Sequence, residues 1–426
     1  MILADTLIQF AIRPEGWIHS VHGDFDVPRG PVGVLFYLVF VPLFWIVPRR
    51  WRAHYLTVTS LMLTVATVGP AFTITLAVLA VIGWAIIRTL ARGQSYWIGL
   101  ALLVVGYATL ILYPQPAWLP PVHEPLYFYV HWAGLGYMFL RTVHVLNDVS
   151  RLKLSPPGLT DWLAYLLFAP TLRMGPIFRY RDFVEQMRGE LARERRLVAG
   201  TGRLLNGMVR LAAVAVLIDK NNFPLDVLFN DPGQLSAGAF IFRIYLAPFS
   251  FFLWISGYVE LSIGIGRLMG FVVPENFNYP WSSSNIAEFW QRWHITLGAW
   301  LRDYVFTPMV RRRWHYFWAF TVTFLLCGLW HGNCWCYVIW GTAQGVGLAV
   351  LRVWGQFWKR QHSIGSPLYR RLVALRLVGS PVSTVLAWLL TLHYEVITIL
   401  IGMDIEHAGL RVAARALELI RTAAGF

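Results

Sequence analysis

The chain has 426 residues, of which 57% are hydrophobic and only 14% are charged, and its mean hydropathy is +0.53. Soluble domains carry roughly 25% charged residues and avoid large exposed apolar patches, so this composition excludes an ordinary soluble domain and predicts a membrane protein. The net charge of +14 is concentrated in short loops between apolar runs, which argues against a nucleic-acid partner and indicates membrane lipid with an anionic cytoplasmic face.

Residues Met1 to Ile12 lack a basic start and a small-residue cleavage site, so we expect no signal peptide. A helix needs about 20 apolar residues to cross the hydrocarbon layer. The stretch from Tyr55 to Ile87 is too long for one span, and Gly69-Pro70 divides it, because proline cannot continue the helical hydrogen-bond ladder. The other expected spans are Pro31 to Val47, Tyr96 to Tyr113, Leu126 to Leu146, Leu204 to Ile218, Ala237 to Val259, Tyr316 to Trp330, Trp335 to Leu351 and Pro381 to Ile401.

Two further segments, one apolar and one amphipathic, do not have the pattern of an ordinary transmembrane span. The stretch Trp162 to Leu172 is short, as expected of a re-entrant element, and Asp404 to Ala424 has the spacing of an amphipathic surface helix. The sequence therefore predicts an all-α polytopic membrane protein with about ten spans. In the absence of repeats or linkers, we expect residues 1–426 to form a single domain.

Loop charge predicts the orientation of the spans. The loops Tyr113 to Pro125 and Asp219 to Asp231 carry acids, and the positive-inside rule places them outside. The same rule places the basic loops in the cytoplasm. These loops hold Arg49 to Arg52, Arg88 and Arg92, Arg151 and Lys153, seven arginines between Arg179 and Arg203, Arg311 to Arg313, and Lys359-Arg360.

Ionisable groups inside apolar segments are costly and are therefore functional candidates. The densest region runs from Pro274 to Met309 and contains His294, whereas His331 ends the strongly apolar run from Phe324 to Trp330. Burial favours the neutral form of an imidazole, which is the form that a general base needs. Taken singly, either histidine could be purely structural. We expect the three cysteines, Cys327, Cys334 and Cys336, to be packing residues rather than metal ligands.

Several long motifs occur in an order that resembles the membrane-bound O-acyltransferase family, and in particular its branch of bacterial alginate O-acetylation proteins. The resemblance covers a core of about residues 165–350. The motifs are Gly175 to Arg181, Ser256-Gly257-Tyr258, Gly264 to Arg267, Pro274 to Asn278, Glu288 to His294, Trp300 to Tyr304, and Gly328-Leu329-Trp330-His331-Gly332.

The resemblance implies spans around a central tunnel and transfer from a cytoplasmic acyl thioester to a hydroxyl on or near the other side. It implies that His331 is catalytic and that His294 is the second invariant member. Acyl transfer needs a base and oxyanion stabilisation, so we expect His331 to be the base. His294 would bond the thioester carbonyl or orient the acceptor. Further tunnel candidates are Asn276, Glu288, Trp290, Arg292, Trp293, Arg302, Asp303, Trp330 and Asn333.

We expect no metal and no permanently bound cofactor; acetyl-CoA or an acyl carrier protein would be the co-substrate. The arginines from Arg179 to Arg203 could attract that anionic donor or merely set the topology. The resemblance implies a polysaccharide acceptor, a periplasmic hydrolase-fold partner and a multi-pass location in a bacterial inner membrane. Similarity to D-alanyl transfer proteins of teichoic acid synthesis leaves D-alanyl transfer as an alternative. A transporter or flippase without acyl chemistry is the alternative of a different class.

Overall fold

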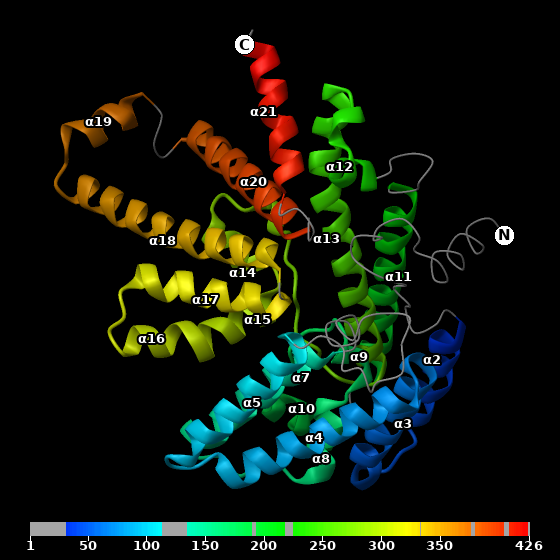
Figure 1. Cartoon of the computed structure of the whole chain (residues 1–426). Helices are drawn as coiled ribbons and strands as arrows, with labels where there is room; N and C mark the ends of the chain where they lie inside the picture. The colour runs from blue at the N-terminus through cyan, green and yellow to red at the C-terminus, as the bar shows by residue number, and fades with distance from the viewer. Residues whose placement is uncertain are drawn as a thin grey trace. The chain divides into compact units, whose positions relative to one another are not determined.

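The structure is a computed structural model, which describes residues 31–112, 134–189, 193–217, 225–332, 334–375, 380–403 and 409–424. Over these ranges the chain consists of helices joined by turns and loops, without a β-strand (Figure 1), so the all-α class is confirmed. The chain divides into two compact units. One comprises Met1–Phe223 and Ser250–Glu275, and the other comprises Pro224–Phe249 and Asn276–Phe426.

The first unit is built from helices that follow the predicted apolar segments closely. The predicted break is confirmed: α3 ends at Val68, Gly69 has a φ of 97°, and Pro70 begins α4. The helices are α2 (Pro31–Phe44), η1 (Arg49–Trp51), α3 (Arg52–Val68), α4 (Pro70–Leu90), α5 (Ser95–Leu112), α7 (Leu135–Arg151), α8 (Leu159–Leu166), α9 (Ala169–Leu172), α10 (Tyr180–Arg188), α11 (Arg193–Leu217) and the second part of α13 (Ala237–Leu268). The predicted span Leu126 to Leu146 begins outside the described residues.

The short apolar stretch predicted to be re-entrant forms two short helices, α8 and α9. The indole of Trp162 donates to the carbonyl of Ala80 at 2.7 Å, which ties α8 to α4. The fully buried guanidinium of Arg141, on α7, donates to the carbonyl and hydroxyl oxygens of Thr171 at 2.6 and 2.7 Å. Irregular backbone inside an apolar protein needs such internal partners for its polar groups.

Helices α11 and α13 approach closely because glycines face one another. A Cβ added at Gly207 would lie 2.8 Å from the carbonyl oxygen of Gly257, and one at Gly264 would lie 3.0 Å from that of Gly200. Small residues of this kind let transmembrane helices pack backbone against backbone. An ion pair also joins the two helices: Arg203 of α11 donates to both carboxylate oxygens of Glu260 of α13, at 3.0 and 2.9 Å.

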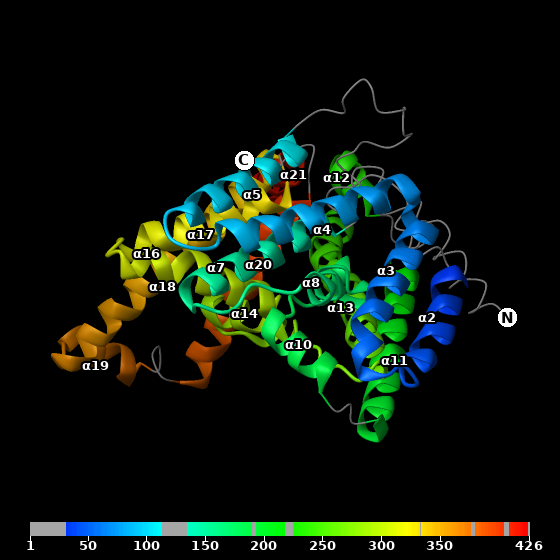
Figure 2. The same ribbon diagram turned by 90° about the horizontal axis from the view of Figure 1, so that it is seen from below.

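The second unit contains an antiparallel helix hairpin, α17 (Tyr316–His331) and α18 (Trp335–Ser363), whose helices lie side by side (Figures 1 and 2). A Cβ at Gly328 would collide with the carbonyl of Tyr337, and one at Gly341 would collide with that of Phe324. The other elements of this unit are α12 (Asp226–Asn230), η2 (Pro232–Gln234), the first part of α13, η3 (Pro280–Ser282), α14 (Ile286–Arg292), α15 (Ile295–Leu301), η4 (Arg302–Phe306), α16 (Thr307–Arg311), α19 (Pro367–Ala374), α20 (Pro381–Met403) and α21 (Leu410–Ala424).

Four helices of the described chain are long and apolar enough to cross a membrane: Phe72–Leu90, Ala237–Leu268, Trp335–Ser363 and Pro381–Met403. Two shorter apolar helices, Ser95–Thr109 and Tyr316–His331, accompany them. Their surfaces carry exposed Val, Ile and Leu side chains, which suit lipid rather than water. The chain is therefore a multi-pass membrane protein, while the count of about ten spans stays a prediction.

The carboxyl-terminal amphipathic segment is helical from Leu410, and residues 404–408 lie outside the described residues. Two arginines of α21 hold it to its own unit: Arg411 donates to the carbonyl of Asn230 at 2.7 Å, and Arg415 donates to that of Leu235 at 2.9 Å. Its position on a membrane surface stays a prediction.

Candidate active site

His294 lies in a tight turn between α14 and α15. It has a φ of 43° and a ψ of 52°, so a bulky residue occupies the left-handed region that normally favours glycine or asparagine. Its carbonyl accepts the first hydrogen bond of α15, from Gly298 N at 3.0 Å. A strained backbone at a buried polar residue points to a functional constraint on that position.

The segment that contains Asn276 holds this turn in place. The Asn276 carbonyl accepts from Ile295 N at 2.9 Å, and its side-chain oxygen accepts from the amide and the hydroxyl of Thr296 at 3.1 and 2.6 Å. Asn278 N donates to the carbonyl of Arg292 at 2.9 Å, on the other side of the turn. The predicted tunnel residue Asn276 is thus a fully buried support for the His294 turn.

Aromatic side chains enclose the same turn. Trp293 stacks on Phe289 with ring centroids 5.3 Å apart and meets Phe277 edge-on at 5.2 Å, and Phe277 lies 6.3 Å from the ring of His294. His294 is 5% exposed, and this burial lowers the pKa of its imidazole from 6.5 to about 4. The side chain is therefore neutral at physiological pH.

Glu288 and Arg292, both predicted tunnel candidates, lie on α14 and stabilise that helix and the loop before it. Their place in a tunnel stays a prediction. Glu288 accepts from the amide and hydroxyl of Ser284 at 2.9 and 3.0 Å, while its own amide donates to the capping oxygen of Asn285 at 2.8 Å. This reciprocal arrangement resembles a capping box. The Ser284 amide is the main reason that the pKa of Glu288 is lowered, and Arg292 pairs with its other oxygen at 2.6 Å.

Arg302 and Asp303 belong to a π-helical turn, η4, and pair with each other at 2.9 Å. Their side chains are 66% and 40% exposed. Both side chains are thus partly or largely exposed, and their role as tunnel candidates stays a prediction. The short π-helical insert itself is a feature that is common at functional sites.

His331 is the last residue of α17, and three aromatic rings surround it. Its ring centroid lies 4.7 Å from that of Trp330, 5.7 Å from that of Tyr337 and 5.3 Å from that of Trp340. Tyr337 is stacked, whereas both indoles meet the imidazole edge-on. His331 is half-buried, and the predicted tunnel residue Asn333 lies outside the described residues.

Trp290 connects the two histidine segments. It lies on α14, four residues before His294, and its indole meets the ring of Trp340 at 6.0 Å. The Trp290 N–H donates to the side-chain oxygen of Gln344 at 3.0 Å, and Gln344 in turn donates to Glu395 at 2.9 Å. Gln344 and Glu395 are not among the predicted site residues, although a carboxyl within the apolar run Pro381 to Ile401 is a signal of a functional position.

The expectation that the cysteines serve only as packing residues is wrong for two of them. Cys334 and Cys336 form a disulfide at the start of α18, and the Cys334 sulfur also accepts from the Cys336 amide. Cys327 is buried within α17 as a free thiol. The hairpin thus carries a covalent link directly after the His331 turn.

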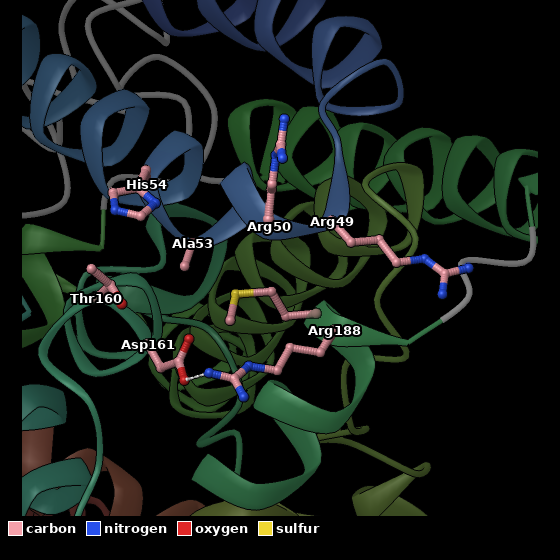
Figure 3. Close-up of a pocket in the computed structure, with 8 residues that line it drawn as sticks. Arg49, Arg50, Ala53, His54, Thr160, Asp161 and Arg188 are labelled. Carbon is pink, nitrogen blue, oxygen red and sulfur yellow. Dashed lines mark hydrogen bonds and ion pairs between the residues drawn. The ribbon is translucent and has the colours of Figure 1, made fainter.

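A separate cavity of about 260 Å³ lies in the first unit (Figure 3). Arg188 pairs with Asp161 there, and Arg49 extends away from the other lining residues. The neighbouring Arg52 donates to the carbonyls of Met187 and Gly189 at 3.1 and 3.0 Å, which fastens the end of α10 to α3. The lining residues are Arg49, Arg50, Ala53, His54, Thr160, Asp161, Met187 and Arg188.

The sequence of the chain is similar to those of known proteins. "Probable alginate O-acetylase AlgI" of Azotobacter vinelandii is 33% identical over 226 residues, which are 51% of this chain and 44% of that protein. Teichoic acid D-alanyltransferase of Streptococcus thermophilus is 25% identical over 352 residues, or 76% of this chain and 81% of that protein. Peptidoglycan O-acetyltransferase of Helicobacter pylori is 28% identical over 230 residues, or 51% of this chain and 43% of that protein.

The chain spans less than half the length of the curated alginate O-acetylase relatives it matches at 33% identity. The model of the membrane-bound O-acyltransferase family matches residues 72–374. This range includes both histidines, the helix hairpin and four of the eight residues that line the cavity of Figure 3. With more than two thirds of its residues inside that match, the chain belongs to the membrane-bound O-acyltransferase family.

Proposed function

We propose that this chain is a membrane-embedded O-acyltransferase that moves an acetyl group from a cytoplasmic thioester toward a hydroxyl of an extracytoplasmic polysaccharide. The observation that carries the proposal is the placement of His331 at the end of an apolar helix, inside a ring of aromatic side chains. Family membership and the names of the acetyl-transferring relatives support the choice of reaction. Among bacterial membranes, the inner membrane suits a cytoplasmic donor.

The proposed chemistry uses His331 as the base and the neutral imidazole of His294 as a hydrogen-bond donor. His331 takes the proton of the acceptor hydroxyl while that oxygen attacks the thioester carbonyl carbon. The carbon–sulfur bond then breaks, and the proton on His331 passes to the leaving thiolate. His294, neutral because burial lowers its pKa to about 4, offers one N–H donor to the oxyanion that forms at the carbonyl.

The donor would be acetyl-CoA or an acyl carrier protein, both of which carry phosphate groups. The cavity of the first unit is lined by three arginines and a single acid, so the net positive charge of its lining would attract such a donor. Replacing Arg49 and Arg50 with serine should raise the KM for the donor several-fold at low salt and leave kcat unchanged. Replacing the exposed Arg370 and Arg371 with serine removes the same charge elsewhere, and that variant should keep the native KM.

D-alanyl transfer is the second candidate function. One observation favours it: the teichoic acid D-alanyltransferase of Streptococcus thermophilus matches this chain over 81% of its own length, a larger share than the alginate relatives reach. In that case a D-alanyl carrier protein would replace acetyl-CoA. A periplasmic hydrolase-fold acetyltransferase is the expected partner for acetyl transfer only.

The deciding experiment uses the full chain in proteoliposomes with acceptor polysaccharide. One sample receives ¹⁴C-acetyl-CoA as donor, and a second receives a ¹⁴C-D-alanyl carrier protein. We expect alkali-labile label on the polysaccharide from acetyl-CoA, and its loss in His331→Ala. Label only from the carrier protein would replace acetylation with D-alanylation. Donor that crosses the bilayer unchanged, with no covalent label on any hydroxyl, would establish a transporter and overturn both candidates.

A further inference from the structure

Two polar side chains are buried together inside membrane-spanning helices of the second unit. Gln344 of α18 is 0% exposed and Glu395 of α20 is 1% exposed. A polar group in this setting is costly unless it is hydrogen-bonded, and a carboxyl in a transmembrane helix is costlier still. Their presence therefore calls for a role other than packing.

The hydrogen bonds fix the orientation of the Gln344 amide. Its nitrogen donates to a carboxylate oxygen of Glu395 and to the hydroxyl oxygen of Thr398, both at 2.9 Å. Thr398 must accept, because its own hydrogen is donated to the carbonyl of Tyr394 at 3.0 Å. The amide oxygen consequently faces the opposite way and accepts from the indole N–H of Trp290 at 3.0 Å.

Aromatic contacts connect the ring of Trp290 to that of His331. Its ring packs edge-on against Phe324 at 4.6 Å and meets Trp340 at 6.0 Å, and Trp340 lies edge-on to His331 at 5.3 Å. Interlocked aromatic rings of this kind have few alternative packings. A change in the orientation of the Trp290 ring would therefore change the packing of Trp340 and, through it, the orientation of the His331 ring.

We propose that Gln344 and Glu395 are positioning residues for the proposed acyl transfer: the buried pair locks the indole of Trp290, which through Trp340 sets the orientation of the His331 ring. The inference rests on the proposed function of His331. One oxygen of Glu395 is buried without a hydrogen-bond partner among the described residues. That unsatisfied oxygen is a cost that a leucine at this position would remove.

The test compares single replacements with an exchange. Gln344→Leu removes the acceptor of Trp290. The double variant Q344E/E395Q preserves the bonds from Trp290 to position 344 and between positions 344 and 395, since the carboxylate then accepts from Trp290 and from the exchanged amide; the bond from position 344 to Thr398 is lost unless the Thr398 hydroxyl turns to donate. Gln356→Leu, at an exposed glutamine of the same helix, is the matched control. Activity is measured as kcat and KM for the acetyl thioester in proteoliposomes.

We expect Gln344→Leu to lower kcat about tenfold or more with KM nearly unchanged, and the exchange to restore kcat to within about threefold. The control should behave as the native chain does. Glu395→Gln keeps an acceptor for the Gln344 amide and should also keep most of kcat. Native kcat in Gln344→Leu, or an exchange variant as impaired as the single variant, would overturn the positioning role.

A second readout does not depend on turnover. The rate at which diethyl pyrocarbonate modifies His331, followed by mass spectrometry of its peptide, should rise about threefold or more in Gln344→Leu and return in the exchange. If the native protein transfers no acyl group, the proposed function fails while this measurement still decides the positioning. An unchanged rate at His331 in Gln344→Leu would reject the inference regardless of activity.

Discussion

The imidazole of His331 lies edge-on to the indole of Trp340, with ring centroids 5.3 Å apart and an interplanar angle of 87°. The contact joins the last residue of α17 to the second turn of α18, and so it depends on the hairpin being closed. The histidine is therefore oriented by packing across two helices rather than by its own helix alone.

Replacement of Trp340 should impair transfer without unfolding the hairpin. Trp340→Leu removes the edge-on contact, so we expect kcat to fall roughly tenfold with little change in the KM for donor. Trp354→Leu is the matched control, because Trp354 lies on the same helix with 55% of its surface exposed. Equal kcat values for the two variants would mean that the contact does not orient His331.

The glycine contacts between α17 and α18 should tolerate no added methyl group. Gly341→Ala would push a Cβ into the carbonyl of Phe324, and we expect it to lower the free energy of unfolding by about 2 kcal/mol or more. Gly355→Ala on the same helix meets nothing within 4 Å and should be neutral or slightly stabilising. Thermal unfolding in detergent measures both; a Gly341→Ala variant as stable as the native chain would contradict the packing.

Stability should fall in mildly acidic solution because His294 is held neutral. Its pKa is about 4 in the folded protein and 6.5 when unperturbed, so the unfolded chain binds the proton first. The contribution is complete above pH 6.5 and is lost as the pH falls toward 4, the loss amounting to about 2 kcal/mol at pH 5. His294→Asn, which tolerates the left-handed backbone, should lose less stability than the native chain between pH 7 and 5.

The comparison is made by thermal unfolding in detergent at several pH values. Other titrating groups act in both proteins, so the difference between the two curves isolates position 294. Parallel curves would show that His294 does not carry a lowered pKa.

Glu288 should matter for helix α14 and not for the chemistry. Glu288→Gln keeps an acceptor for the Ser284 amide, so we expect near-native transfer, whereas Glu288→Ala should cost about 1 kcal/mol of stability. Rates of acyl transfer and melting temperatures of the two variants are the measurements. Complete loss of transfer in the stable Glu288→Gln variant would show that the Glu288 carboxylate takes part in the reaction.

The sequence predicted what depends on local pattern. Apolar length and the Gly69-Pro70 break located the helices, because both act through neighbouring residues. The Gln344–Glu395 pair could not be predicted, since the two residues are 51 positions apart and meet only when α18 packs on α20. Likewise, the capping role of Glu288 and the exposure of Arg302 follow from loop geometry that composition does not encode.

The left-handed backbone of His294 has a consequence for engineering. Holding a non-glycine residue there costs on the order of 1 kcal/mol in every folded molecule, whether or not it meets a substrate. Screens that select for thermal stability alone are therefore expected to enrich glycine or asparagine at position 294. The selected proteins would be more stable but would lack the imidazole. A stabilisation campaign on this chain needs a selection for acyl transfer at every round.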